Sequence, residues 1–392
     1  MRRMRAIPWM MHSPRRRWIG QLAALASMLA QPGASWSAST GGGFASVLPG
    51  RTLQFPRDHG AHPDYRIEWW YVTAWLRETG ASDRPWTDDG LGLQITFFRV
   101  ASGHARDNPS RFAPSQLLFA HAALALPTQP RLLHAQRASR AGLGLAFAAE
   151  QDTDIRLGNW SLSRSADDRY RTQIGTDDFA LDLSMAARNV PVLQGEQGLS
   201  RKGPAPEQAS FYYSRPWLAV SGDIVMRNRA GGASPRRLTL AGDAWFDHEW
   251  SSQVLDDQAS GWDWVGLHLD DGTSLMAFRI RALDGTDRWR EAHWTTGPGR
   301  DPSAGRAAPA PRFVPQRHWQ SPRTGARWPV EMALAVGERR FVLSPMLDDQ
   351  ELDTRQSTGI VYWEGAVRVM ESGRMVGRGY LELTGYHQPL RL

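Results

Sequence analysis

Short runs in which apolar and polar positions alternate recur along the chain and predict a protein built from β-strands. Successive side chains of a strand point to opposite faces of its sheet, so a period of two separates strands from helices. Turn residues divide the runs at spacings that favour strands over long helices. The predicted strands are residues 65–76, 91–100, 117–126, 155–163, 170–174, 179–186, 211–213, 218–226, 236–250, 262–269, 274–281, 328–336, 340–343, 360–369 and 378–386. The pattern of residues 131–141 fits a helix instead.

The first predicted strand is apolar on both faces, which predicts that both sides are covered. Glu68, Trp70 and Val72 share one face, and Trp69 and Tyr71 share the other. A carboxylate among apolar neighbours must be paired or carry a raised pKa. Glu68 is therefore a candidate functional acid.

The stretch from Gly242 to Val265 joins more aromatic rings to more titratable groups than any other part of the chain. As a strand, its first half divides into two faces because side chains alternate. One face carries Asp243, Trp245, Asp247 and Glu249, and the other carries Ala244, Phe246, His248 and Trp250. Trp262, Asp263 and Trp264 begin the next run. We expect the functional pocket to lie near the junction of these two strands.

The pattern as a whole predicts an all-β fold of two β-barrel or sandwich domains packed together. A chain of 392 residues is long enough for two β domains and too long for one ordinary core. The first strand of the 242–265 stretch closes the first half, and the second opens a smaller unit. The predicted domains are residues 44–254 and 255–392.

Composition agrees with a folded protein, and the charge does not indicate a nucleic-acid partner. The chain is 41% hydrophobic and 10% aromatic, with 18 Trp, which is a globular composition. Its net charge of +6 comes from six arginines in the first 40 residues, where there is no Asp or Glu. The remainder is close to neutral and contains one lysine, Lys202. It has no basic stripe of the kind that a phosphate backbone requires.

The N-terminal arginines and the segment after them have the layout of an export signal. Residues 2–17 contain the six arginines, residues 18–30 form an apolar run, and small residues follow up to position 38. Residues 1–38 are the predicted signal peptide, and residues 15–19 also resemble a twin-arginine signal. The apolar run is too short to span a bilayer, so we expect a periplasmic or secreted protein without a stable membrane span in the mature chain. There is no cysteine, which excludes disulfides and a lipid-anchored cysteine.

Metal chemistry and hydrolysis receive less support from the residues than acid–base chemistry does. His248 has Asp247 and Glu249 beside it but no second histidine at the spacing of a zinc motif, and His59 and His62 can join it only through the fold. A buried, hydrogen-bonded histidine is the simpler interpretation, so we expect no metal and no cofactor. The chain has no GxSxG motif and no cysteine nucleophile.

Acid catalysis in an apolar pocket fits the clustered acids and rings. Glu68 and Asp263 each share a predicted face with apolar residues, which raises a carboxyl pKa and suits a general acid. Aromatic faces stabilise a developing cation by roughly 2 kcal/mol or more when desolvated. A proton donor beside aromatic rings is what adding water across an electron-rich alkene requires. The alternative is that these acids only bond tryptophan N–H groups inside the fold.

Motifs that combine aromatic, acidic and glycine residues recur along the chain: residues 62–71 (HPDYRIEWWY), 97–99 (FFR), 158–160 (GNW), 211–214 (FYYS), 244–251 (AWFDHEWS), 261–264 (GWDW), 362–365 (YWEG) and 379–386 (GYLELTGY). Together they resemble the motifs of AttH-like proteins, a family related to carotenoid 1,2-hydratase. The resemblance covers residues 45–388 and implies two lipocalin-like, calycin-type domains. It also implies cofactor-free hydration of an isoprenoid double bond, with the catalytic His and Trp of the hydratases at His248 and Trp250. The Tyr and Asp that follow in the hydratases have no counterpart near residues 276–278.

The resulting hypothesis is an exported, lipocalin-like protein that acts on a small apolar substrate, such as an isoprenoid, by hydratase-like acid–base chemistry. A non-catalytic carrier of a lipophilic molecule is the first alternative, and a hydrolase is the second. The candidate catalytic residues are His248, Asp247, Glu249, Glu68 and Asp263. The candidate substrate-binding residues are Trp250, Trp245, Trp262, Trp264, Trp70 and Tyr71.

Overall fold

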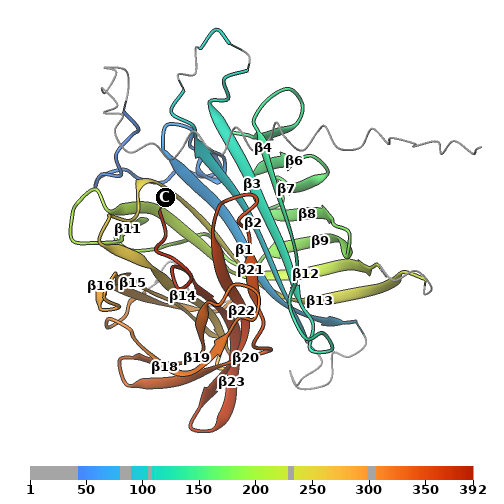
Figure 1. The fold of residues 1–392 in the computed structure, drawn as a ribbon, viewed down its shortest axis with the longest axis vertical. Helices are drawn as coiled ribbons and strands as arrows, with labels where there is room; N and C mark the ends of the chain where they lie inside the picture. The colour runs from blue at the N-terminus through green and yellow to red at the C-terminus, as the bar shows by residue number, and fades with distance from the viewer. Residues whose placement is uncertain are drawn as a thin grey trace, which may run out of the picture. The chain divides into compact units, whose positions relative to one another are not determined.

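Two antiparallel β-sheets make up nearly all the regular structure of the protein (Figure 1). The computed structural model describes residues 43–79, 90–104, 108–110, 112–227, 234–298 and 306–391. In these ranges no helix has the length and apolarity needed to cross a membrane. One short 3-10 helix, η2 (Arg57–His59), precedes the first strand. The predicted signal peptide, residues 1–38, lies outside the described residues and stays a prediction.

The first sheet has the strand order β4-β3-β2-β1-β13-β12-β9-β8-β7-β6-β5, with β10 and β11 paired to β12. Its strands are β1 (Ile67–Glu78), β2 (Leu91–Ala101), β3 (Gln116–Ala125), β4 (Leu133–Arg140), β5 (Ala146–Ala148), β6 (Asp154–Leu157), β7 (Trp160–Arg164), β8 (Arg169–Gly175), β9 (Phe179–Ala187), β10 (Val192–Leu193), β11 (Leu199–Arg201), β12 (Ala209–Met226) and β13 (Arg236–Gln253).

The second sheet has the order β17-β16-β15-β14-β23-β22-β20-β19-β18, with β21 paired to β22. Its strands are β14 (Ala259–Leu269), β15 (Thr273–Ala282), β16 (Asp287–Thr296), β17 (Arg306–Ala307), β18 (Arg312–Gln320), β19 (Arg327–Val336), β20 (Arg339–Pro345), β21 (Glu351–Asp353), β22 (Val361–Glu371) and β23 (Arg374–Leu383). The predicted domain boundary after residue 254 falls between β13 and β14.

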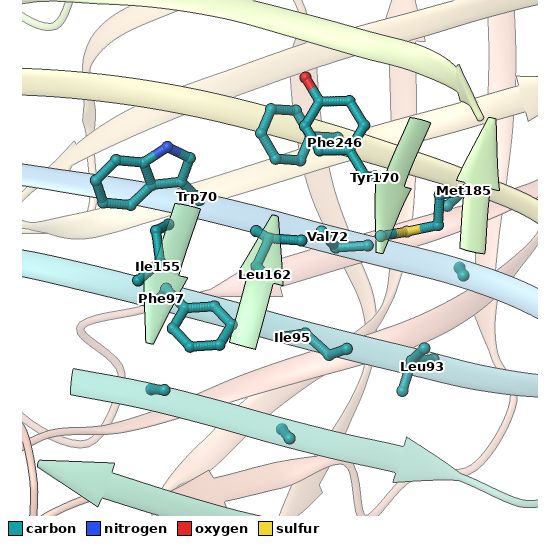
Figure 2. Packing of buried hydrophobic residues seen from close by; sticks show 14 of the residues in the cluster. Trp70, Val72, Leu93, Ile95, Phe97, Ile155, Leu162, Tyr170, Met185 and Phe246 are labelled. Carbon is teal, nitrogen blue, oxygen red and sulfur yellow. The ribbon is translucent and has the colours of Figure 1, made fainter. Parts of the chain in front are cut away.

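The first sheet curls so that its far end approaches β3 and β4, and the inside of this curl is an apolar core. Arg137 of β4 contributes to the closure, because its guanidinium lies 5.0 Å from the ring centroid of Trp160 on β7. Figure 2 shows this core, in which side chains of β1 and β2 pack against those of the shorter strands. Trp70, Phe97 and Phe246 are among its fully buried members.

The two sheets pack against each other through β1, β13 and β14, and residues 44–392 form one compact unit. The indole of Trp75 on β1 donates to the carbonyl of Gly379 on β23 at 2.8 Å. Arg378 of β23 donates to Asp243 of β13 at 2.5 Å. The predicted cover on both faces of β1 is therefore confirmed: Trp70 faces the first core, and Trp75 faces the second sheet.

The all-β prediction is confirmed, and the differences lie in individual elements. Residues 131–141 contain a strand, β4, and not a helix, because β3 provides a pairing edge that the local pattern cannot show. The predicted strand 155–163 is a tight hairpin that turns at Gly158, whose φ of 62° favours glycine. Residues 211–226 form one strand, β12, interrupted by a bulge between Arg215 and Leu218. The pattern missed β16, which is rich in charged residues, and β18, whose run is interrupted by Pro315.

Candidate functional site

A cavity of about 320 Å³ lies between the two sheets and is lined by residues from both. Its size is within the roughly 300–1,000 Å³ of small-molecule sites. The rings that line it are Trp69, Tyr71, Phe98, Phe119, Trp262, Trp264, Phe278 and Tyr362, and the titratable side chains include Asp247, Glu249, Glu364, Glu382 and Lys202. This combination of a mainly apolar wall and a few convergent polar groups is typical of a ligand site.

Asp247 reaches the cavity because β13 alternates its side chains between the two sheets. Its Oδ1 accepts hydrogen bonds from Ser214 Oγ at 2.5 Å and from Trp245 Nε1 at 2.7 Å. Its Oδ2 accepts one from Tyr212 Oη at 2.8 Å. Burial raises the pKa of Asp247 to about 7, although these three hydrogen bonds favour the charged form. The carboxyl group therefore changes charge near neutral pH.

Glu364 and Glu382 come from the second sheet and lie opposite each other on β22 and β23. Burial, followed by the neighbouring Glu382, raises the pKa of Glu364 well above its usual range. Burial also raises the pKa of Glu382 to about 7. Two carboxyl groups side by side cannot both ionise easily, so at neutral pH this pair holds at least one proton.

Tyr71 connects the acids of the two sheets. On β1 it is the register partner of Asp247, and its hydroxyl donates to Glu364 Oε2 at 3.0 Å. Oε1 of Glu364 is buried and has no hydrogen-bond partner among the described residues. A proton carried on this oxygen therefore has no protein acceptor among the described residues.

Glu249 and Lys202 form a buried ion pair at the cavity wall. Lys202 Nζ lies 2.9 Å from Glu249 Oε1, and both side chains are less than one-tenth exposed. Ser210 Oγ donates to the same carboxylate oxygen. The pair is consistent with the rule that buried charges are paired and hydrogen-bonded.

His248 lies on the opposite face of β13, which points into the core enclosed by the curled first sheet. It does not line the cavity. Its Nε2 donates to Glu68 Oε1 at 2.8 Å, and its Nδ1 lies 3.2 Å from Tyr213 Oη. Burial lowers the pKa of His248 to about 4, so the imidazole is neutral at neutral pH. Its ring lies 4.9 Å from that of Trp250 and 4.7 Å from that of Trp70.

Glu68 is the centre of the network around His248. Its Oε1 lies 2.7 Å from His62 Nδ1, and its Oε2 accepts from Arg99 Nε at 2.7 Å. His62 Nε2 in turn lies 2.9 Å from Asp58 Oδ1. Both ring nitrogens of His62 therefore face carboxylate oxygens. The expected raised pKa is wrong for Glu68: burial is outweighed by these cationic partners and hydrogen bonds, and its pKa lies well below the usual range.

Asp263 belongs to a third, separate cluster on the inner face of β14. Arg279 Nε donates to its Oδ2 at 2.7 Å, and Arg281 Nε donates to its Oδ1 at 3.0 Å. Tyr386 Oη also donates to Oδ2, at 3.1 Å. Asp263 does not line the cavity, whereas its neighbours Trp262 and Trp264 do.

Ser357 brings a serine beside a histidine at the cavity wall, which bears on the hydrolase alternative. His121 Nε2 lies 3.0 Å from Ser357 Oγ, and His121 Nδ1 lies 2.8 Å from Tyr362 Oη. Burial lowers the pKa of His121 to about 3, so this ring carries one proton. Ser357 Oγ donates to Gln136 Oε1 at 2.7 Å, which directs the serine proton away from the histidine. The hydroxyl is therefore not arranged as an activated nucleophile.

The chain matches the model of the AttH-like family over residues 46–386. It belongs to the AttH-like family. A crystal structure of a candidate AttH from Nitrosomonas europaea is similar to it, with 45% sequence identity, a TM-score of 0.76, and coverage of 88% of this chain and 100% of that one. Kievitone hydratase from Nectria haematococca has the same fold, with 14% identity, a TM-score of 0.62, and coverage of 88% and 96%. No curated protein matches the chain.

These similarities confirm the predicted family and the lipocalin-like fold. The structure places the predicted site residues of this AttH-like protein in separate groups. Those that line the cavity are Asp247, Glu249, Trp262, Trp264 and Tyr71, with Trp245 bonded to Asp247 behind the wall. Those on the inner side of the first sheet are His248, Glu68, Trp70 and Trp250. Asp263 stands apart from both. The catalytic roles predicted for His248, Glu68 and Asp263 stay predictions.

Sequence analysis gave no role to Glu364, Glu382, Tyr362 or Lys202, all of which line the cavity of the AttH-like chain. Two signals for them were present. Glu364 and Glu382 lie in the family motifs 362–365 and 379–386, each beside aromatic or apolar residues. Lys202 is the single lysine of the chain. Neither signal says which residues of the first half these side chains meet.

His62, Glu68 and His248 also bring three possible metal-ligand atoms within 4.8 Å of one another. The carboxylate oxygen lies 2.7 and 2.8 Å from the two ring nitrogens, which are hydrogen-bond distances. The Arg99 guanidinium occupies the other oxygen of the same carboxylate. This donor set is already satisfied by protons and an arginine, so it fits a hydrogen-bonded cluster better than a metal site.

The raised pKa of Glu382 predicts a measurable loss of stability on the way to neutral pH. Its pKa is near 4.5 when unfolded and about 7 in the fold, so between these values the native state binds more protons than the unfolded state. The contribution of Glu382 to the free energy of unfolding is complete below pH 4.5 and is lost as the pH rises towards about 7. The free energy of unfolding, measured with urea across this pH range, should fall less steeply for Glu382→Gln than for the unsubstituted protein. An unchanged slope would contradict the assigned pKa.

Proposed function

We propose that this AttH-like protein binds a small apolar molecule between its two sheets and adds water to a carbon–carbon double bond of it. The observation that carries the proposal is Glu364, which lines an aromatic cavity together with Asp247 and has one buried carboxyl oxygen without a partner among the described residues. Kievitone hydratase shares the fold, which makes hydration the first reaction to test. Export through the predicted signal at residues 1–38 is part of the proposal.

The first step assigned to the site is proton transfer from Glu364. Its pKa is raised, so the carboxyl group keeps its proton at neutral pH. The proton forms a new C–H bond at one alkene carbon and leaves a carbocation at the other. Trp69, Trp262 and Trp264 line the cavity and present ring faces of the kind that stabilise such a cation.

The second step is the addition of water, with Asp247 as the base. The water oxygen bonds to the cation, and Asp247 takes the proton that water releases. A pKa of about 7 suits this role, because a base is most effective when its pKa is close to the working pH. Tyr71 is the register partner of Asp247 and donates to Glu364, so we assign it the relay that returns the proton to Glu364 and restores the starting state.

Conversion in oxygen-18 water tests the proposal directly. The full chain is incubated with farnesene and with an acyclic carotenoid, and we expect an alcohol that contains the labelled oxygen. Asp247→Asn should remove this product while leaving ligand binding intact, as measured by quenching of tryptophan fluorescence.

Saturable quenching without any product would support the carrier alternative instead. No quenching and no product with either compound would contradict both. Mass spectrometry of small molecules that copurify with the chain would supply further compounds to test in the same assay.

A further inference from the structure

Lys202 is the single lysine among the 46 Lys and Arg residues of the chain, and it is inside the cavity wall. Its side chain is 6% exposed. It directly follows β11, whose partner β12 carries Tyr212, the tyrosine that donates to Asp247. A chain that places arginine at every other basic position therefore places its one ammonium group against an apolar ligand space.

Among the described residues, the ammonium of Lys202 has one more N–H donor than it has oxygen partners. A lysine ammonium has three N–H donors. One is directed to Glu249 Oε1 at 2.9 Å, and one to Ser200 Oγ at 3.1 Å. Within the described part of the chain, its remaining close neighbours are aromatic rings: Nζ lies 4.2 Å from the ring centroid of Phe278 and 4.9 Å from that of Tyr212. Lys202 and Phe278 both line the cavity, so the third N–H lies on the side of the ammonium that faces an aromatic ring of the cavity wall and not a protein oxygen.

The surrounding charges favour a neutral oxygen over an anion as the partner of this donor. Glu249 already balances the charge of Lys202. Asp247, Glu364 and Glu382 line the same cavity, so a ligand carboxylate would meet further acids. A carbonyl oxygen accepts a hydrogen bond from an ammonium without bringing another negative charge into the apolar space.

We infer that Lys202 binds the carbonyl oxygen of an otherwise apolar ligand. The preferred ligands are then lipophilic ketones or similar carbonyl compounds, which should bind more tightly than hydrocarbons of the same size. This inference rests on the proposed function, because it assumes that the cavity binds an apolar molecule. It goes further by assigning the recognition of one polar group to one residue outside the proton-transfer pair.

Three probes of matched chain length test this assignment: decane, methyl octyl ketone and decanoate. Binding is measured by competition with anilinonaphthalene sulfonate on the full chain. The ketone should bind at least about tenfold more tightly than decane, the lower range for a hydrogen bond to a charged group. In Lys202→Met that preference should fall to within about twofold, while the affinity for decane stays the same.

Two further variants keep the test independent of folding. Lys202→Met combined with Glu249→Gln removes both charges of the pair, and should lose the same preference without leaving a buried unpaired carboxylate. Glu249→Gln alone leaves the ammonium unbalanced, so it should shift the preference from the ketone towards decanoate. A purely structural lysine would not produce that reversal.

A direct readout comes from lysine labelled with nitrogen-15 at Nζ, which gives a single side-chain signal because the chain has one lysine. The signal should move on addition of methyl octyl ketone and not on addition of decane. Equal binding of ketone and decane, with no effect of the variants, overturns the role of Lys202 and leaves the proposed function standing. Failure of all three probes to bind overturns both.

Discussion

Glu364→Gln is expected to lower the rate of hydration by about 10²–10⁴-fold, the usual contribution of a general acid. Glutamine keeps the shape of the side chain and can still accept from Tyr71, but it has no acidic proton. Because the raised pKa keeps Glu364 neutral at neutral pH, the substitution changes little electrostatically and the fold should persist. The measurement is the single-turnover rate with farnesene at pH 7, with tryptophan quenching as the control for binding.

Two comparisons show whether the loss is specific. Glu207→Gln makes the same chemical change at an exposed position away from the cavity and should retain the full rate. His248→Asn tests the role that the family resemblance implies for His248. If that variant stays folded and loses the reaction while Glu364→Gln keeps it, the proton transfer belongs to His248 and our assignment is wrong.

Arg99→Met should destabilise the protein by about 3–5 kcal/mol, the typical cost of leaving a buried charge without its partner. Arg99 is 2% exposed and donates to Glu68, to Gln116, and to the carbonyl groups of His62 and Tyr65. Methionine fills similar space but provides none of these donors. The Glu68 carboxylate would then keep only its two histidine partners in a fully buried site. The measurement is the urea unfolding midpoint, with the slope checked for two-state behaviour.

Arg171→Met is the matched control for this loss. Arg171 forms a bidentate ion pair with Asp182, in which Nε donates to Oδ1 at 2.9 Å and Nη2 donates to Oδ2 at 2.7 Å. Both side chains are largely exposed. Solvent screens such a pair, so its removal should change the midpoint very little. Equal effects of the two substitutions on the urea midpoint would mean that the Glu68 network contributes no more to stability than a surface ion pair does.

The two large predictions concern the residue clusters on opposite faces of β1 and β13, and this separation suggests a division of roles. Asp247 on β13 and Tyr71 on β1 face the second sheet and the cavity. Their neighbours His248 and Glu68 face the first core, where they hold η2 and the loop after it through Asp58 and His62. One motif can thus serve ligand chemistry and the stability of the first sheet at once.

The sequence by itself determined the local properties of this protein. The period of two predicted most strands, the cover on both faces of β1, and the separation of Asp247 and Glu249 from His248 and Trp250. These properties follow from the geometry of a single strand, in which each side chain points opposite to the one before it. Motifs along the chain also identified the AttH-like family.

Only the tertiary structure decided which face of β13 meets the cavity and which residues complete it. Each face of β13 carries a tryptophan and a titratable side chain in the sequence, so the pattern could not rank them. Glu364 and Glu382 come from β22 and β23, more than a hundred residues after Asp247, and reach it only because the two sheets pack together. The same holds for Glu68: its neighbours in sequence predict a raised pKa, whereas Arg99, His62 and His248, brought in by strand pairing and by the preceding loop, lower it. Charge and proton affinity depend on contacts between distant segments, which alternation along one strand cannot specify.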